Sequence, residues 1–257
     1  MKNRSIILAL VFIFIGLFVG SSYAKFDLQD CMGAWLFDEG KGDVAGDISD
    51  LQNDGTISGA KWVDGKFDKA LDFSNAGDKI DIANNDNYNE LDEITILSWV
   101  YLRRAVTSGT WNAIAGKNPY ANGYLMWIDV PREPCGLVYA GGARFDDRSG
   151  VQLELETWYH LAFTRNAKGV MNFYIDGKMI KETTSTAGPI TINAGTLTIA
   201  GQSPQTLDGI VDEVIFFSVA LEDDVINNIM INGLNGALAV TETGKLASTW
   251  SYIKTSE

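Results

Sequence analysis

Apolar and polar positions alternate with a period of two along most of this chain, which is the pattern of strands rather than helices. The alternation is clearest between residues 157 and 180. Its apolar positions are Tyr159, Leu161, Phe163, Met171, Phe173 and Ile175. The segment therefore predicts two strands whose apolar side chains share one face, and we expect that face to line the core.

Two turn sequences divide this region into hairpins. The polar stretch 166–169 ends in Gly169, and glycine readily adopts the positive φ at which many hairpins reverse. Asp176-Gly177 is the dipeptide that best suits a type I′ turn, so residues 178–182 are predicted to run back along residues 172–175. The sequence thus predicts an antiparallel sheet.

Similar short strands are predicted along the rest of the chain, separated by turns rich in glycine, asparagine and aspartate. They cover residues 32–37, 56–62, 70–73, 79–82, 94–102, 113–117, 123–129, 136–140, 151–155, 196–200 and 209–217. So many short strands predict an all-β fold of two packed antiparallel sheets.

One segment has the spacing of a helix. Apolar residues after Leu221 recur at intervals of three and four, and the acids at 222–224 complement the dipole of a first helical turn. Gly233 is expected to end this short C-terminal helix. Residues 234–257 have a weaker pattern, and we interpret them as a tail that packs on the domain or attaches it to something else.

The first 24 residues have the composition of a secretory signal peptide. Lys2 and Arg4 precede an apolar run over residues 6–20, and small residues follow up to Ala24. We expect cleavage after Ala24, because the run is short for a membrane-spanning helix. The mature protein would then be secreted, periplasmic or on the cell surface, without insertion in the membrane.

The charge of the chain bears on which partners it can bind. The chain has 33 acidic and 20 basic residues, and cleavage would remove two of the basic ones. Nothing supplies a basic stripe for phosphates, so binding to nucleic acid is not expected.

Cys31 and Cys135 either form one disulfide in an oxidising compartment or remain separate buried thiols.

Several short motifs recur in the order known from one family of β-sandwiches. They are GKF (65–67), ALDF (70–73), DKIDI (78–82), ITILSWV (94–100), WYHLA (158–162), YIDGK (174–178), GIVDEV (209–214) and ALED (220–223). Together they resemble a laminin G-like, concanavalin A-like lectin/glucanase jelly roll over residues 31–232. The resemblance implies one jelly-roll domain, residues 25–233, with neighbouring first and last strands. This fold hosts lectins, glycanases, sialidase-associated modules and adhesion domains, so it does not choose among functions.

A calcium site is the first functional hypothesis. Alternation puts Asp212 on the same face as Val214 and Phe216, where a carboxylate needs a partner. The loop after the first strand offers many oxygen atoms, and calcium takes about six to eight of them. The candidate ligands are Asp38, Asp43, Asp47, Asn53 and Asp212. In the alternative, Asp212 caps backbone amides and the loop acids are solvated.

A glycan site is the second hypothesis. Sugars have apolar ring faces and polar edges, so aromatic rings, amides and charged groups hold them. The candidate ligand-binding residues are Trp111, Asn112, Tyr120, Tyr124 and Arg144, with Asn122, Trp127, Tyr139 and Asp146 nearby in the sequence. The alternative for each aromatic residue is packing in the core or under a loop.

Signals for catalysis are weak. Glu154 and Glu156 would share one face of a strand, but the third acid of the glycanase motif in this fold is missing, so surface charge is the better interpretation. His160 is the only histidine, and no Gly-x-Ser-x-Gly turn occurs. We therefore predict an exported, non-catalytic binding module for carbohydrate recognition or adhesion, with a structural calcium ion and a glycan or an extracellular protein as partner. The alternatives are a polysaccharide-acting glycoside hydrolase of the same fold and a protein-binding structural domain.

Overall fold

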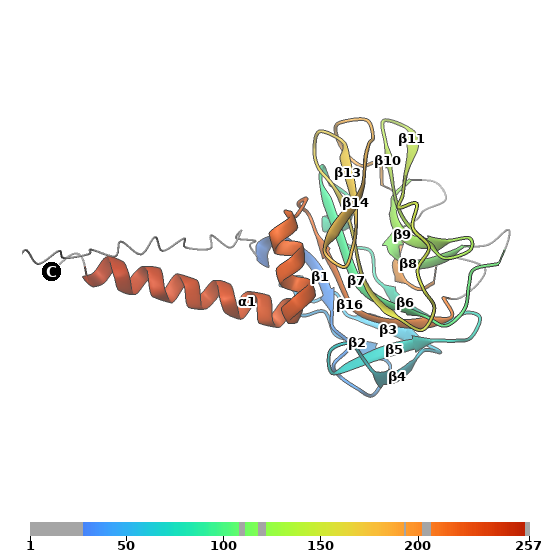
Figure 1. Cartoon of the computed structure of the whole chain (residues 1–257), viewed down its shortest axis with the longest axis horizontal. Coiled ribbons are helices and arrows are strands. Elements are labelled where there is room, and N and C mark those ends of the chain that lie inside the picture. The colour runs from blue at the N-terminus through green and yellow to red at the C-terminus, as the bar shows by residue number, and fades with distance from the viewer. Residues whose placement is uncertain (1–27, 108–110, 118–121, 193, 202–206, 255–257) are drawn as a thin grey trace, which may run out of the picture.

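The computed structural model describes residues 28–107, 111–117, 122–192, 194–201 and 207–254. Within these ranges the chain forms two eight-stranded antiparallel sheets, packed face to face, with one α-helix on the outside (Figure 1). The predicted all-β jelly-roll sandwich with a C-terminal helix is therefore confirmed. The signal peptide predicted for residues 1–24 lies outside the described residues.

The first sheet, sheet A, has the strand order β14-β13-β12-β7-β16-β5-β4, and β1 also pairs with β16. Its strands are β1 (Cys31–Trp35), β4 (Lys61–Asp64), β5 (Lys69–Phe73), β7 (Ile94–Leu102), β12 (Trp158–Arg165), β13 (Val170–Ile175), β14 (Lys178–Thr184) and β16 (Gly209–Phe217). The first and last strands of the sandwich are thus neighbours, as the family resemblance implied.

The second sheet, sheet B, has the strand order β11-β10-β9-β8-β15-β6-β3-β2. Its strands are β2 (Val44–Ala45), β3 (Gly55–Ser58), β6 (Lys79–Ile82), β8 (Asn112–Lys117), β9 (Tyr124–Asp129), β10 (Glu133–Ala140), β11 (Ala143–Arg148) and β15 (Leu197–Ile199). Two short 3₁₀ helices, η1 (Leu28–Asp30) and η2 (Asp86–Tyr88), precede β1 and β7.

The inward faces of the two sheets form one apolar core, and the hairpins of β12, β13 and β14 contribute one wall of it. Leu161, Phe163, Met171 and Phe173 are buried there. The predicted turn at Asp176-Gly177 is also confirmed, because both residues have positive φ, 48° and 72°.

Two strand predictions were wrong, and strand β11 was missed. Residues 56–62 were predicted as one strand, but Gly59, at φ 80°, turns the chain from β3 in sheet B to β4 in sheet A. Residues 151–155 form no strand, whereas β11, which was not predicted, covers Ala143–Arg148. The charged side chains of β11 hid its alternation.

Helix α1 (Asp223–Lys254) packs on the outward side of sheet A. Val225, Ile226 and Ile229 are buried against Ile215 and Phe217 of β16, in a cluster separate from the inter-sheet core. Gly233, at φ 66°, interrupts the helix where the sequence predicted its end. The chain then becomes helical again up to Lys254, in a part that was interpreted as a weakly patterned tail and that extends away from the sandwich (Figure 1).

The two cysteines lie on opposite outward sides of the sandwich. Cys31 belongs to the cluster beneath α1, whereas Cys135 belongs to an apolar cluster on the outward side of sheet B. Both thiols are free and buried. The alternative of two separate buried thiols is therefore the one that the structure shows. As for the membrane, the helices of the described part include none that combines the length and the apolar character needed to span it.

Candidate functional site

An apolar cluster lies on the outward face of strands β8 to β10, away from the inter-sheet core. It consists of Ala113, Leu125, Trp127, Cys135 and Leu137. The register brings these side chains together, because Trp127 pairs with both Ala113 and Cys135 while Leu125 pairs with Leu137, and directly opposed residues share one face of a sheet. Trp111 and Tyr139, both partly buried, pack against the cluster.

Strand β11 adds charged residues to the same face. Arg144 lies opposite Tyr139, and Asp146 lies opposite Leu137. The Arg144 guanidinium carbon is 5.7 Å from the centre of the Trp127 ring, and Arg144 Nε donates a hydrogen bond to Asp146 Oδ1 at 2.6 Å. The Arg144 and Asp146 side chains are 45% and 32% exposed. Their free edges are thus accessible to a ligand.

Arg148 extends this charged row along β11. It donates to Asp129 and, through Nη1, to Glu133 Oε2 at 3.0 Å. Two arginines therefore face three carboxylates. We call the outward surface formed by Trp111, Trp127, Tyr139, Arg144, Asp146 and Arg148 the aromatic face.

The structure brings together two of the five predicted ligand-binding residues. Trp111 and Arg144 both lie on the aromatic face. Asn112 is 5% exposed and lies opposite Ile128, a residue of the inter-sheet core. Tyr124 is fully buried in that core, and burial raises the pKa of its hydroxyl well above the usual value. Tyr120 lies outside the described residues.

Sequence reasoning missed Arg148 and its two acidic partners. Their role on this face depends on β11, whose pairing with β10 was not predicted. A signal was nevertheless present, since Arg144, Asp146 and Arg148 recur at every second position and so share one face of a strand. The interpretation failed because all three are charged, and period-two patterns are usually recognised by their apolar positions.

The predicted calcium ligand Asp47 is fully used by the protein itself. Its Oδ1 accepts from the amides of Ala34 and Ser49 at 2.8 and 2.9 Å, and its Oδ2 accepts from Ser49 Oγ and the Asn53 amide at 2.8 and 2.9 Å. Asn53 is held in turn, since its side-chain Oδ1 accepts from Asn85 Nδ2. This network fastens the loop after β1 to the rest of the sandwich.

Asp212 does not lie where the alternation predicted. A β-bulge interrupts β16 between Asp212 and Ile215, and Glu213 within it has φ 53°. Val214 and Phe216 therefore face the inter-sheet core, whereas Asp212 is opposite Trp99 on the outward side. The prediction that Asp212 shares a face with Val214 and Phe216 was wrong, because one extra residue reverses the alternation.

Asp212 binds backbone amides instead of the acidic loop. Its Oδ2 accepts from Lys66 N at 2.8 Å and Phe67 N at 3.0 Å, whereas its buried Oδ1 has no hydrogen-bond partner among the described residues. Burial raises the pKa of this carboxyl to about 8. The contacts match the alternative in which Asp212 caps amides.

The five predicted calcium ligands do not meet at one point. Asp38 accepts a long 3.4 Å hydrogen bond from the Lys69 amide, and Asp43 is exposed. Within the described ranges, no group of three or more histidine, cysteine, aspartate or glutamate side chains could hold a metal ion. The geometry thus does not fit an ion shared by Asp212 and the loop. Calcium binding by the remaining loop acids stays a prediction.

The residues considered for catalysis have structural surroundings. His160 is 2% exposed and packs edge-to-face on Trp99, and burial lowers its pKa to about 3. Glu154 is 75% exposed and forms a loose ion pair of 3.7 Å with Arg132. A neutral, enclosed imidazole and a solvated carboxylate are poorly placed to act as an acid-base pair.

Comparison with known proteins identifies similar folds. The family model of the concanavalin A-like lectin/glucanases superfamily matches residues 74–227, more than half of the chain. No curated protein matches the sequence.

Three solved structures illustrate the likeness. The binding domain of Paraclostridial Mosquitocidal Protein 1 aligns with a TM-score of 0.66 at 14% identity, over 79% of this chain and 52% of that one. Domain 4 of AbnA, a GH43 extracellular arabinanase from Geobacillus stearothermophilus solved with arabinotriose, aligns with a TM-score of 0.62 at 18% identity, over 78% of this chain and 98% of that one. The binding domain of botulinum neurotoxin DC, solved with rat synaptotagmin II, aligns with a TM-score of 0.60 at 17% identity, over 79% of this chain and 51% of that one.

The chain thus spans about half the length of the two toxin binding domains, at 52% and 51%, and nearly all of the arabinanase domain, at 98%. At such low identity these likenesses show the shared fold alone. All three are described as binding domains or as a domain solved with a bound sugar.

Proposed function

Because the chain belongs to the concanavalin A-like lectin/glucanases superfamily, we propose that it is a non-catalytic carbohydrate-binding module whose sugar lies on the aromatic face. The observation that carries the proposal is the meeting of Trp111 and Tyr139 with the Arg144–Asp146 pair on one outward sheet surface. Half-buried rings can cover the apolar face of a sugar, and the charged pair can donate to and accept from its hydroxyl groups.

Trp127 has a supporting role in this arrangement. It is 3% exposed and lies beneath the Arg144 guanidinium, so it holds the cation at the surface rather than contacting the sugar itself. Asp146 fixes the same guanidinium from the side. The ligand would therefore meet a preorganised donor, which lowers the entropy lost on binding.

The charges favour a neutral glycan. The two arginines of the aromatic face are offset by Asp129, Glu133 and Asp146, and the whole chain has a net charge of −13. A strongly anionic glycan would be repelled by this surface. Arabinotriose, which the similar arabinanase domain binds in its solved structure, is a suitable first probe.

We also propose that the protein is exported and that it can bind calcium away from the sugar. The leader-like residues 1–24 support a location outside the cytoplasm, where glycans are accessible. Calcium held by the exposed acids of the loop after β1 would stabilise the module without touching the sugar, since none of the loop residues belongs to the aromatic face.

A glycan array followed by calorimetry with arabinotriose tests the function. We expect saturable binding of a neutral glycan. Trp111→Ala and Arg144→Ala should each raise the Kd by about tenfold or more. Trp111→Tyr should retain most of the affinity because it keeps a ring at that position. The matched control is Trp158→Ala, which removes a half-buried tryptophan that packs on Tyr101 of sheet A.

Two results would overturn the proposal. Silence across the array, combined with capture of an extracellular protein, would favour an adhesion or protein-binding domain. Release of new reducing ends from a polysaccharide would favour the glycoside hydrolase alternative.

A further inference from the structure

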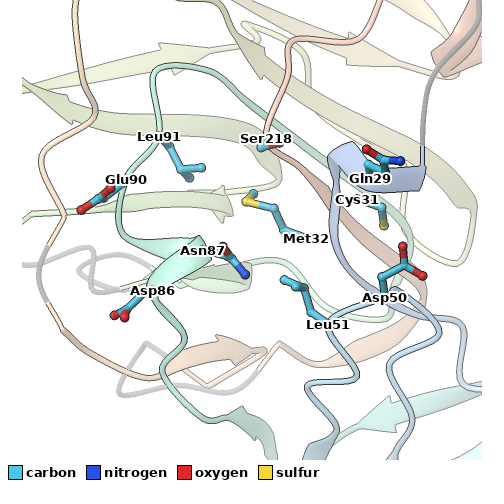
Figure 2. Close-up of a pocket in the computed structure, with 10 residues that line it drawn as sticks. All are labelled: Gln29, Cys31, Met32, Asp50, Leu51, Asp86, Asn87, Glu90, Leu91 and Ser218. Atoms are coloured by element: carbon cyan, nitrogen blue, oxygen red, sulfur yellow. The ribbon is translucent and has the colours of Figure 1, made fainter.

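A cleft of about 650 Å³ lies between the start of β1, the loop that contains Asp50 and Leu51, and the segment from Asp86 to Leu91 (Figure 2). Its volume falls within the roughly 300–1,000 Å³ range of small-molecule sites. None of its lining residues belongs to the aromatic face, so the cleft is a separate feature of the molecule.

The floor of the cleft is apolar. Met32 and Leu91 are 4% and 3% exposed and belong to the inter-sheet core, and Leu51 packs against that core from the loop. Their side chains project toward the middle of the cleft (Figure 2). A ligand that reaches the floor would therefore contact methyl and methylene groups, chiefly those of the partly exposed Leu51.

The rim of the cleft carries three exposed carboxylates. Asp86 and Glu90 lie on one side of the floor and Asp50 on the other (Figure 2). In the described part of the chain, none of the three forms an ion pair or a side-chain hydrogen bond, and no lysine or arginine lines the cleft. The rim is thus negatively charged and without a compensating cation.

We propose that this cleft binds an aliphatic polyamine. The methylene segments of such a ligand would lie on Met32, Leu51 and Leu91, while its ammonium groups would reach the separated carboxylates of the rim. A single metal ion is a poorer match, because the carboxylates do not form a group that could hold one. A neutral apolar ligand would leave the charged rim without a role.

The probe is spermidine, measured by calorimetry at low ionic strength with the purified protein. Spermidine should bind with one-to-one stoichiometry, and binding should weaken as salt is added because the rim carboxylates are exposed. Octane-1,8-diol, which has the stem without the charges, and ethane-1,2-diamine, which has charges without a long stem, should both fail to bind. Equal binding of either control would overturn the proposal.

Variants locate the site. The double variant Asp86→Asn/Glu90→Gln should raise the spermidine Kd by about tenfold or more. The matched control, Asp43→Asn/Glu154→Gln, removes two exposed carboxylates outside the cleft and should change the Kd by less than about twofold. Similar losses in both would indicate diffuse attraction to an acidic protein and would overturn the proposal.

Two further measurements distinguish a polyamine site from a peptide-binding site and from the proposed glycan site. Binding of tetralysine without binding of spermidine would assign the cleft to a basic segment of a partner protein, against the proposal. Glycan binding should be unchanged in Asp86→Asn/Glu90→Gln, because those residues lie outside the aromatic face. A failure of the polyamine proposal is thereby distinguishable from a failure of the proposed carbohydrate function.

Discussion

The outward faces of the two sheets differ, although their inward faces share a single core. On sheet A, helix α1 covers Ile215 and Phe217 of β16 with its own apolar residues. On sheet B, the corresponding apolar cluster around Trp127 and Leu137 is bordered by Trp111, Tyr139 and a row of charged side chains. One face is closed by the chain itself, and the other offers rings and charges to a ligand.

From this difference we infer that one face serves as scaffold while the other is free for function. A β-sandwich needs only its inward faces to fold, so its outward faces can be used in different ways. Sheet A uses its face to anchor the first part of α1. Sheet B is left with the aromatic face, and we place the proposed glycan site there.

The largest effect is expected on the outward face of sheet A that α1 covers. Ile226 of α1 is fully buried against sheet A, so Ile226→Ala should cost about 2–5 kcal/mol of unfolding free energy, through lost burial and a residual cavity. Ile231 of the same helix is 65% exposed, so Ile231→Ala should stay within about 0.5 kcal/mol. Urea denaturation measures both. Equal small effects would mean that α1 does not close sheet A.

The contact between sheet A and α1 should also make the stability of the protein depend on pH. Glu213 of sheet A accepts a hydrogen bond from the Leu234 amide of α1, and burial, together with the nearby Asp38 charge, raises its pKa to about 7. The folded protein then keeps the proton while the unfolded chain ionises, so stability is fully present below the normal glutamate pKa and is lost as the pH rises toward 7. Burial of Asp212, with a pKa of about 8, acts in the same direction.

Thermal unfolding between pH 5 and 8 should therefore show a lower Tm at the higher pH, by roughly 2–4 °C for each kcal/mol lost. Buried His160 opposes this trend, because the unfolded chain takes up a proton below pH 6.5 and the folded one does not. Glu213→Gln keeps an acceptor for Leu234 and should flatten the slope above pH 5. An unchanged slope in that variant would contradict the assigned cause.

A smaller effect is expected on the aromatic face. The Arg144–Asp146 pair is partly exposed and joined at 2.6 Å, so a double-mutant cycle with Arg144→Ala and Asp146→Ala should give a coupling of about 0.2–1 kcal/mol to stability. The same variants should affect glycan affinity more than stability. A coupling free energy well above this range would mean that the pair stabilises the fold. The outward face of sheet B would then contribute to stability, as that of sheet A does.

Calcium should have the smallest effect, and it concerns the loop that joins β1 of sheet A to β2 and β3 of sheet B. Since Asp47 is already saturated by protein donors, only exposed acids such as Asp38 and Asp43 remain for an ion. A weak site half filled with calcium adds about 0.4 kcal/mol. Melting with calcium and with EDTA measures it, and a shift of many degrees would contradict this expectation of a weak site.

Much of the fold was predictable because alternation is a local property. The hairpins of β12, β13 and β14, the turn at Asp176-Gly177 and the wall of Leu161 and Phe173 all followed from short-range spacing. Errors arose where a single backbone conformation changed the outcome. Gly59 sends the chain to the other sheet, and the bulge at Glu213 turns Asp212 outward, and neither event alters the composition of its segment.

The candidate site was predictable only in part. Trp111 and Arg144 were selected for their chemistry, and both lie on the aromatic face, but the same reasoning selected Tyr124, which belongs to the core. An aromatic residue in a strand looks the same in sequence whichever way it points. Its direction depends on the register of the whole sheet.

The sequence by itself determined which residues alternate, where the chain turns and which family of folds it resembles, because these depend on neighbours within a few positions. Only the tertiary structure decided that α1 closes sheet A while β11 brings Arg144 and Asp146 beside Trp127 and Tyr139. Those contacts arise from pairing between strands that are distant in sequence. Long-range pairing is set by the packing of the whole core, which no local pattern contains.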